Sequence, residues 1–476
     1  MSVSSNNALD SLFHPKNVAF VGASPKGQRG NRFILSYIRQ NFKGKIFPVH
    51  PTADAIMGFK AYPSVMDIPD EVDLMIFSIP YTAVMQVMRD CVEKGVKFVH
   101  LFTAGFSETG LEENIRLEQE VLALAREGGV RIVGPNCMGL YCPEGGIAWD
   151  DNHPNISGPV GFVSQSGQLA SMFINEASSN HGLYFSKVVS FGNAADLQAH
   201  DFLNYLADDD KTRIIGSYIE GLKDGRAFFE FAREITRKKP LVVWKGGQTE
   251  GGGRATQSHT ASIAGSPKIW KALCKQTGVI SVDSMEELAA TIAALLRLPK
   301  TQGTNVAVLG GAGGGSVTMT DMAEKEGLKV PHLSENTINT LLKTVPISGT
   351  SVKNPLDIGF SSMYEKQDEF FNLFALLRDD PRIDAMIFSR GNRPGRGRRN
   401  GMEQLNNMVL KGMDIIKKPV LVVLNNHGTV EAAAQREEAV QKFNAANVPT
   451  FASFPLAARV LKNMSDYNDF LNSPAN

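Results

Sequence analysis

The sequence Val18-Ala19-Phe20-Val21-Gly22-Ala23-Ser24-Pro25-Lys26-Gly27-Gln28-Arg29-Gly30 runs from an apolar stretch directly into a turn of small residues. The apolar residues at its start predict a buried β-strand. A helical pattern follows the turn, because Ile34, Tyr37 and Ile38 have the i, i+3, i+4 spacing of a buried helix face. A strand, a tight turn and a helix in this order predict the first unit of a parallel α/β sheet.

The same alternation of apolar runs and helix-length segments continues along the chain. Two polar stretches that contain Pro or Gly, residues 150–159 and 299–304, interrupt it and are predicted linkers. After each linker the pattern restarts with a strand, a turn of small residues and a helix, so the second and third segments resemble two copies of one architecture. Further strands are predicted at residues 46–49, 74–79, 98–102, 131–133, 161–163, 187–190, 214–219, 241–244, 306–309, 385–388 and 420–424. We therefore predict an α/β protein with three domains, at residues 1–150, 151–300 and 301–476.

The composition is that of an ordinary cytosolic enzyme. The 476 residues are 43% hydrophobic and 21% charged, and 49 Lys plus Arg balance 49 Asp plus Glu. This neutral balance argues against nucleic acid or an anionic membrane as a partner. The N-terminus lacks the basic and apolar regions of a signal peptide, and no apolar run reaches the length of a membrane span. Without a CxxC pair, the four cysteines are expected to be thiols in the reducing cytoplasm; they are Cys91, Cys137, Cys142 and Cys274.

The first turn is a candidate anion site. Small residues before a helix let backbone N–H groups approach a phosphate. The second predicted strand ends in Pro48-Val49-His50-Pro51-Thr52, without the acid that usually binds a dinucleotide ribose. Lys26, Arg29 and Arg32 supply positive charge instead, which suits a ligand with an additional phosphate. The turn alone does not decide between NADP and coenzyme A, and a turn needed only for packing is the alternative.

Two later turns also precede helices. In the second turn, Ser164–Gly167, hydroxyl and N–H donors at a helix start can bind an anion. An ordinary serine N-cap explains these residues as well. The third turn has five glycines in the six residues 310–315. Each glycine costs about 0.5–1 kcal/mol relative to a better helix former, so this run indicates close approach of the backbone to a ligand. We predict a phosphate site built from Ser164, Gln165, Ser166, Gly167, Gly313, Gly314, Gly315 and Ser316.

His259 is the candidate nucleophile. It follows the glycine-rich stretch 246–254, which we expect to be too loose for a helix, and a neutral imidazole can accept a phosphoryl group near pH 7. Glu220, at the end of the predicted strand 214–219, lies where α/β active sites form and could hold one imidazole nitrogen. The alternatives are an incidental histidine on a polar surface loop and a carboxylate that merely caps a turn.

Taken together, these motifs resemble a known family. From about Phe13 to Leu461 the chain is similar to the α-type part of the nucleoside-diphosphate-forming acyl-CoA synthetases, the group that contains ADP-forming acetyl-CoA synthetase and succinyl-CoA synthetase. None of the motifs is sufficient alone, but their shared order is specific. They are Val21–Ser24, Thr103–Glu108, Gly134–Gly139, Ser164–Gly167, Tyr218–Gly221, Lys245–Gly247, Ser258–Thr260 and Asn354–Asp357.

The resemblance implies a domain order and a reaction. A Rossmann-like CoA-binding domain is followed by two flavodoxin-like CoA-ligase domains. Acid, CoA and ATP are converted reversibly to acyl-CoA, ADP and phosphate, through an acyl phosphate and a phosphohistidine. His259 corresponds to that histidine and Glu220 to its carboxylate partner. The two glycine- and serine-rich helix starts correspond to those that face the phosphate.

The helix-start anion site and its cations indicate where CoA binds. We expect Asn136 and Cys137, in another strand-end turn of the same sheet, to lie near the thiol end; the family chemistry gives Cys137 no nucleophilic role, and it is expected to be a small buried residue. The family usually has Val-Asn-Pro-Lys where this chain has Val49–Thr52, so one phosphate contact differs. Ser-His-Thr-Gly becomes Ser258–Ala261, a small change. The predicted CoA contacts are Gly22, Ala23, Ser24, Lys26 and Arg29.

The nucleotide half-reaction is expected to need another polypeptide. No ATP-grasp region is visible in the sequence, so the resemblance implies a separate ATP-grasp β subunit, a hetero-oligomer, and ATP or ADP with Mg²⁺ bound on that partner. The small carboxylic acid, ADP versus GDP, the subunit stoichiometry and the physiological direction are not fixed by the sequence. Two other functions compete: a catalytically silent regulatory protein that binds CoA or acyl-CoA, and a nicotinamide oxidoreductase. Intact His259 and Glu220 argue against the first, and the missing ribose-binding acid argues against the second.

Overall fold

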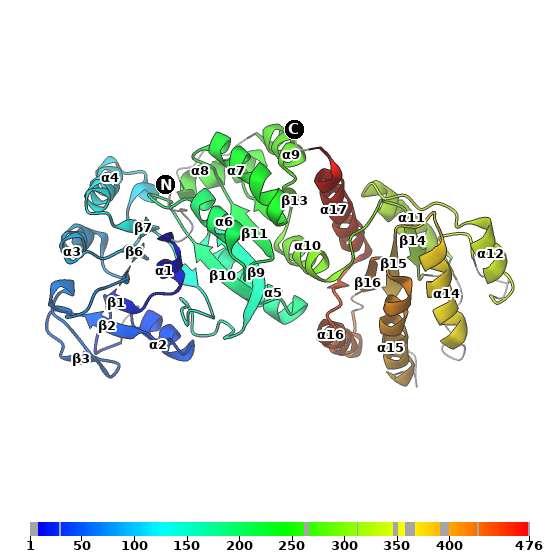
Figure 1. The fold of residues 1–476 in the computed structure, drawn as a ribbon, viewed down its shortest axis with the longest axis horizontal. Helices are drawn as coiled ribbons and strands as arrows, with labels where there is room; N and C mark the ends of the chain where they lie inside the picture. The colour runs from blue at the N-terminus through cyan, green and yellow to red at the C-terminus, as the bar shows by residue number, and fades with distance from the viewer. Residues whose placement is uncertain are drawn as a thin grey trace. The chain divides into compact units, whose positions relative to one another are not determined.

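The computed structural model describes residues 8–27, 30–260, 266–311, 313–345, 351–357, 367–390, 399–425 and 428–474. The chain divides into two compact units (Figure 1). The first unit comprises Met1–Ser178 and Leu183–Met285, and the second comprises Ser179–Gly182 and Glu286–Asn476. No helix in these described ranges is both long and apolar enough to cross a membrane.

The first sheet of the first unit has the strand order of a Rossmann fold. Five parallel strands lie in the order β2-β1-β5-β6-β7. A parallel bridge between Val49 and Tyr62 adds a sixth position beside β2, which completes the order 3-2-1-4-5-6. The strands are β1 (Asn17–Val21), β2 (Lys45–Val49), β5 (Leu74–Phe77), β6 (Phe98–Leu101) and β7 (Arg131–Val133), and a small hairpin joins β3 (Ala55–Ile56) to β4 (Phe59–Lys60).

Helices cover both faces of this sheet. The apolar side chains of α3 and α4 form one core with Met75 and Val99. On the other face α2 buries Phe33, Ile34 and Tyr37. The prediction that Ile38 belongs to this buried face is wrong, because it is 44% exposed and Phe33 takes its place. The helices are α1 (Asp10–Phe13), α2 (Asn31–Arg39), α3 (Tyr81–Lys94) and α4 (Glu112–Glu127), with 3₁₀ turns η2 (Val65–Asp67) and η3 (Ser107–Thr109).

The second sheet of the first unit has flavodoxin-like order. Its parallel strands lie in the order β10-β9-β11-β12-β13, which is 2-1-3-4-5, and β8 adds an antiparallel edge beside β10. β8 precedes residue 150 in the chain, yet it pairs with β10 of this second sheet. The division into three domains at residues 150 and 300 stays a prediction. The strands are β8 (Gly139–Tyr141), β9 (Ser157–Ser164), β10 (Phe185–Ser190), β11 (Ile214–Ile219), β12 (Leu241–Lys245) and β13 (Ile280–Val282). The helices are α5 (Gly167–His181), α6 (Ala199–Asp208), α7 (Gly225–Lys238), α8 (Glu250–Thr260) and α9 (Pro267–Thr277).

The second unit has one parallel sheet with the order β14-β15-β16-β17. A single parallel bridge, Asn305 to Lys329, lies where the second strand of the flavodoxin-like order would be. Alternate side chains of β14 pack on opposite faces: Ala307 and Leu309 contact one core, and Val306 and Val308 the other. The strands are β14 (Val306–Leu309), β15 (Ala385–Arg390), β16 (Val420–Leu424) and β17 (Thr450–Phe451).

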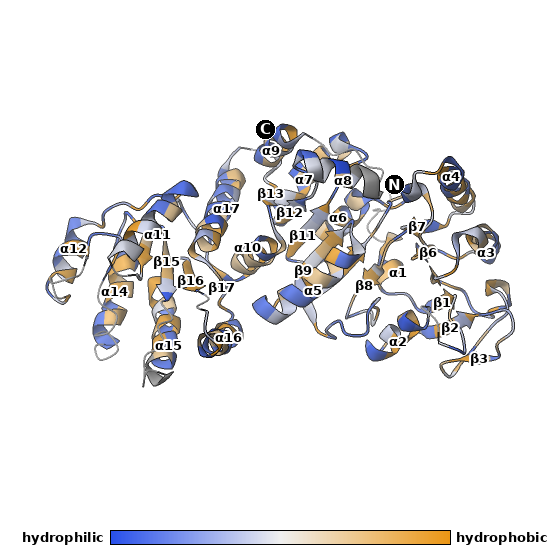
Figure 2. Ribbon diagram, turned by 180° about the vertical axis from the view of Figure 1, so that it is seen from behind, coloured by the Kyte–Doolittle hydropathy of each residue, from blue (hydrophilic) through white to orange (hydrophobic). Residues whose placement is uncertain are grey.

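The helices of the second unit cover the two faces of its sheet. The side chains of α12, α14, α15 and α16 belong to one core, and those of α10, α11 and α17 to the other. In Figure 2 the strands are mostly orange and the outer sides of many helices are blue, as expected for sheets buried on both faces. The helices are α10 (Met285–Arg297), α11 (Gly314–Lys325), α12 (Glu335–Leu341), α14 (Gln367–Asp379), α15 (Arg399–Ile416), α16 (Val430–Ala445) and α17 (Phe454–Asn472).

Candidate active site

The turn after β1 has a backbone that favours glycine. Gly22 has φ +98°, and a Cβ atom there would lie 2.1 Å from the carbonyl oxygen of Ser78. Asn31, the first residue of α2, closes the turn with two hydrogen bonds. Its Oδ1 accepts from the Ser24 N–H at 2.9 Å, and its Nδ2 donates to the Ser24 carbonyl at 3.0 Å. Asn31 was not predicted from the sequence, although asparagine at a helix start is a recognised capping residue.

The other residues predicted for this turn differ in accessibility. Ala23 and Ser24 are buried, with 1% and 6% of their surfaces exposed, so their side chains stabilise the turn. Lys26 is exposed and its ammonium is accessible to a ligand. Arg29 lies outside the described residues.

Arg32 makes contacts within the chain that were not predicted. Its Nε and Nη2 donate to the carbonyl oxygen of Trp149 at 3.2 and 3.1 Å. The guanidinium also lies 5.8 Å from the ring centroid of Phe102. Arg32 therefore binds the segment that follows β8, and its contribution of positive charge to a phosphate site stays a prediction.

The Gly134–Gly139 turn is built from unusual backbone conformations. Gly134, Asn136 and Gly139 all have positive φ, at 107°, 56° and 91°. Cys137 is 4% exposed, and its Sγ donates weakly to two backbone carbonyls. Burial raises the pKa of the Cys137 thiol well above its usual value, in keeping with a small buried residue that packs in the turn.

The loop after β10 packs on this turn and contributes a residue that was not predicted. The Asn193 N–H donates to the Pro135 carbonyl at 3.0 Å, and a Cβ atom on Gly192 would lie 2.3 Å from the same oxygen. The Asn193 side chain donates to Glu108 at 2.6 Å and accepts from Asn136 at 3.5 Å. Its position at the carboxyl end of a parallel strand is the signal that could have identified it.

The start of α5 is arranged by internal hydrogen bonds. The Ser164 hydroxyl donates to the Ser166 carbonyl at 2.7 Å, and Ser164 is fully buried, so this hydroxyl supports the turn. Ser166 Oγ accepts from the Leu169 N–H at 3.3 Å as an N-cap. A Cβ atom on Gly167 would lie 2.3 Å from the Met138 side chain, so the helix start contacts the Gly134–Gly139 turn closely.

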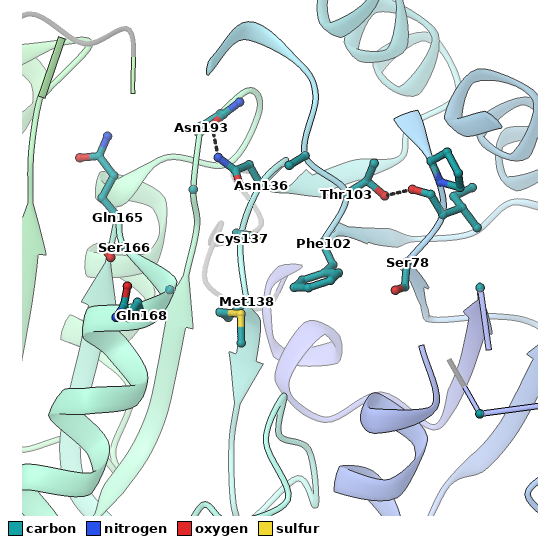
Figure 3. Close-up of a pocket in the computed structure, with 17 residues that line it drawn as sticks. Ser78, Phe102, Thr103, Asn136, Cys137, Met138, Gln165, Ser166, Gln168 and Asn193 are labelled. Carbon is teal, nitrogen blue, oxygen red and sulfur yellow. Dashed lines mark hydrogen bonds between the residues drawn. The ribbon is translucent and has the colours of Figure 1, made fainter. Parts of the chain in front are cut away.

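A cavity of about 970 Å³ joins these turns within the first unit. In Figure 3 the side chains of Ser78 and Phe102 lie across from those of Ser166 and Gln168 at the start of α5. The segment 136–138 lies between them. The wall combines apolar groups with hydroxyl and amide groups, as small-molecule sites do. It consists of Gly22, Gly27, Ser78, Ile79, Pro80, Phe102, Thr103, Ala104, Asn136, Cys137, Met138, Gln165, Ser166, Gly167, Gln168, Gly192 and Asn193.

Glu220 follows β11 and is 8% exposed. Gln165 Oε1 accepts from the Glu220 and Gly221 N–H groups at 2.8 and 3.1 Å, and Tyr218 Oη donates to Glu220 Oε1 at 3.3 Å. Lys245 Nζ donates to the Glu220 carbonyl oxygen at 2.5 Å. Burial lowers the Lys245 pKa, and the Glu220 charge acts in the opposite direction. Gln165 thus links the backbone of Glu220 to the cavity wall, which it also lines.

The segment that contains His259 is partly helical. The expectation that residues 246–254 are too loose for a helix is wrong for residues 250–254, because α8 spans Glu250–Thr260. Thr249 Oγ1 accepts from the Gly252 N–H at 3.1 Å, and Arg254 pairs with Glu250 at 2.9 Å; these contacts offset the cost of three consecutive glycines. His259 is near the C-terminal end of α8, and its side chain lies outside the described residues.

In the second unit the predicted glycine-rich turn precedes α11. Gly313 has φ +53°, and its N–H donates to Asp357 Oδ2 at 3.2 Å. Cβ atoms on Gly313, Gly314 and Gly315 would meet nothing within 4 Å, so packing does not require these glycines. Ser316 is 6% exposed, and its hydroxyl has no hydrogen-bond partner in the described part of the chain. These features leave room for a ligand at this helix start.

Gly22 gives a direct stability test of the first turn. We expect Gly22→Ala to lower the free energy of unfolding by about 1–3 kcal/mol more than Gly58→Ala, because overpacking costs this much. Gly58 is a matched control, since its φ is +86° but a Cβ atom there meets nothing within 4 Å. Urea denaturation of both variants measures the difference; equal losses would contradict the geometry.

Comparisons with known proteins cover most of the chain. Residues 16–143 match the family model for a CoA binding domain, and residues 157–295 match that for a succinyl-CoA ligase like flavodoxin domain. The acetate–CoA ligase [ADP-forming] II subunit alpha of Pyrococcus furiosus is 38% identical over 388 residues, which are 80% of this chain and 81% of that subunit.

A longer relative and a solved structure agree with this match. The acetate–CoA ligase [ADP-forming] II of Archaeoglobus fulgidus is 39% identical over 80% of this chain, which spans only 56% of that protein. The dinucleotide forming acetyl-coenzyme A synthetase 1 of Ca. Korarchaeum cryptofilum, solved with phosphate and ADP, superposes with a TM-score of 0.83. It is 31% identical, and the match covers 97% of each chain.

Proposed function

The chain belongs to the ADP-forming acyl-CoA ligase family, and we propose that it is the CoA-binding, phosphohistidine-carrying subunit of such a ligase. It is an acid–thiol ligase component that converts a small carboxylic acid, CoA and ATP reversibly to acyl-CoA, ADP and phosphate. The observation that supports this most strongly is the cavity of about 970 Å³, which connects the turn after β1 with the start of α5. One chamber can thus hold the thiol end of CoA beside an anion at a helix start.

The cavity suits the first chemical step in the direction that consumes acyl-CoA and forms ATP. CoA extends from the turn at Gly22, Ala23, Ser24 and Lys26 toward Asn136, and Arg29 is assigned to the same site from the sequence. A phosphate oxygen attacks the thioester carbon, the C–S bond breaks, and the CoA thiolate leaves and takes up a proton. The α5 start, Ser166 and Gly167, lies beside the carbon under attack and favours the phosphate charge.

His259 then takes the phosphoryl group from the acyl phosphate. An imidazole nitrogen forms a bond to phosphorus, the P–O bond to the acyl group breaks, and the free carboxylate leaves. Glu220 holds the other imidazole nitrogen and stabilises the positive charge that forms on the ring. In this proposal Gly313, Gly314, Gly315 and Ser316 at the start of α11 provide the second helix N-terminus for the phosphate.

The last step is transfer from phosphohistidine to ADP, which we assign to an ATP-grasp partner subunit that binds the nucleotide with Mg²⁺. The relatives named as alpha subunits support the need for a partner. The glycines at residues 251–253, in the first turns of α8, lower the cost of moving His259 between the two sites. We further propose that the hetero-oligomer works in the cytoplasm.

Ligand binding separates this proposal from a nicotinamide enzyme. At about 100 times its dissociation constant, a ligand that binds only the folded state adds about 2.7 kcal/mol of stability. We therefore expect CoA to raise the melting temperature of the chain and NADP to leave it unchanged. A shift with NADP and none with CoA would overturn the assignment. Thioester formation by the chain with its partner, ATP, CoA and a panel of acids then identifies the substrate.

A further inference from the structure

Lys245 is a buried lysine whose contacts join the backbone of Glu220 to the segment that leads toward His259. It ends β12 and is 7% exposed. Its Nζ donates to the carbonyl oxygen of Glu220 at 2.5 Å and to that of Gly246 at 2.6 Å. Gly246 begins the connection to α8, the helix that contains His259. One ammonium group therefore joins the carboxylate's backbone to the start of the histidine segment.

The peptide groups on both sides of Glu220 are fixed by side chains. Gln165 Oε1 accepts from the Glu220 N–H at 2.8 Å, while Lys245 binds the Glu220 carbonyl. The Gly246 N–H also donates to the Ile219 carbonyl at 2.9 Å. With both of its neighbouring peptide planes held, the backbone of Glu220 is fixed, and with it the direction in which its side chain leaves the strand end.

In both flavodoxin-like sheets a lysine lies just before the amino end of the equivalent strand, which is β12 in the first unit and β16 in the second. Lys239 and Lys418 each precede a proline and then β12 or β16. Like Lys245, each donates from Nζ to two backbone carbonyls, those of Leu206 and Asp209 for Lys239 and those of Leu377 and Asp380 for Lys418. These two lysines are thus part of the shared architecture of the sheets.

At the carboxyl ends of β12 and β16 the two flavodoxin-like sheets differ. In register, Ile219 pairs with Lys245 in the first unit, and Arg390 pairs with Leu424 in the second. Leu424 is fully buried in the apolar core. The shared architecture therefore does not require a lysine at the carboxyl end of this strand. The chain has such a lysine in the sheet in which the neighbouring strand, β11, is followed by Glu220.

We propose that Lys245 is a positioning residue for phosphoryl transfer between the acyl phosphate and His259. It sets the direction of Glu220 and anchors the segment that leads to α8, and it does not touch the reacting atoms. This inference rests on the proposed function. It predicts that only the steps at the Glu220 site depend on Lys245, whereas transfer between phosphohistidine and ADP takes place elsewhere and does not.

The test uses the complex of this chain with its ATP-grasp partner. His259 is labelled from [γ-³²P]ATP and then discharged either with ADP or with CoA plus the best acid of the panel. We expect Lys245→Met to slow discharge by acid and CoA by about 10- to 100-fold, because displacing a catalytic group by about 1 Å has effects of this order. Discharge to ADP should stay within about threefold of the wild type.

Lys239→Met is the matched control, since it also removes a lysine that donates to two carbonyls in the same sheet. We expect both of its discharge rates to stay near the wild-type values. Lys245→Arg, which keeps charged donors, should discharge with acid and CoA faster than Lys245→Met but more slowly than the wild type. If the methionine variant does not fold, Lys245→Arg is compared with Lys239→Arg, and only the former should show the selective defect.

Each remaining outcome decides the question. Wild-type discharge of Lys245→Met by acid and CoA would overturn the positioning role. Equal slowing of both discharge reactions would show that Lys245 only stabilises the fold, which also overturns it. If the wild-type complex takes up no label, the proposed function itself fails and Lys245 is not responsible.

Discussion

We expect His259→Ala to reduce net acyl-CoA ligase activity to background while CoA still binds. The reason is that the histidine is the only proposed covalent carrier of the phosphoryl group between the acyl phosphate and the nucleotide. Splitting the transfer into two in-line steps is what lets two separated sites share one reaction. Alanine is a good helix former, so α8 should tolerate the change at this position. Thioester formation and CoA-dependent melting measure the two properties.

Two variants serve as controls for this prediction. His332→Ala removes an exposed histidine in the second unit and should keep full activity. Glu220→Gln should be milder than His259→Ala, because the amide still accepts a hydrogen bond but lacks the charge that steadies the imidazolium. If His259→Ala kept ligase activity comparable with that of His332→Ala, the phosphohistidine route would be wrong.

The second large effect is dependence on a partner. We expect the purified chain to show no ATP-dependent thioester formation and to become active when an ATP-grasp subunit is added. The longer relative from Archaeoglobus fulgidus, of which this chain spans 56%, is consistent with nucleotide chemistry on additional polypeptide. Activity is measured by CoA consumption at fixed chain concentration while the partner is titrated.

The control for partner dependence is the binding of CoA, which needs no nucleotide. The chain alone should still bind CoA, because the cavity lies entirely within its first unit. Robust turnover of acid, CoA and ATP by the single chain would contradict the assignment of the nucleotide site to a partner.

Much of the fold was predictable because parallel strands buried on both faces are continuous apolar runs. The stretch 420–424 is an example: β16 has those bounds, and all five of its side chains are buried. Three short edge strands were not predicted, whereas β7, an edge strand of three residues, was. β8, β13 and β17 have two or three residues each, too few for a periodic pattern, and β8 pairs antiparallel with a strand that follows it by more than 40 residues.

Two local features were not predicted, for identifiable physical reasons. The glycine run before His259 indicated a loop, but the cap from Thr249 and the Arg254–Glu250 pair allow a helix to begin there. Arg32 was expected to supply positive charge near a ligand, and its contact with the Trp149 carbonyl, in a segment more than 100 residues away, was not predicted. Local propensity cannot anticipate contacts of this range.

The candidate site was likewise predictable only in part. Its turns were predictable because strand-to-helix connections with small residues have a recognisable pattern, as at Gly22 and Gly167. The contacts of Asn193 and Lys245 were not, since their partners, Glu108 and Glu220, lie 85 and 25 residues away in the sequence. Only the fold brings Gln165 within 2.8 Å of the Glu220 backbone.

The most direct test of the whole account is to locate the phosphate on the phosphorylated subunit. The complex is incubated with [γ-³²P]ATP, digested, and its labelled peptide is sequenced. The account predicts one acid-labile, base-stable phosphate on the peptide that contains His259, released by ADP and also by acid plus CoA. Label retained at wild-type stoichiometry on the His259→Ala chain would contradict it.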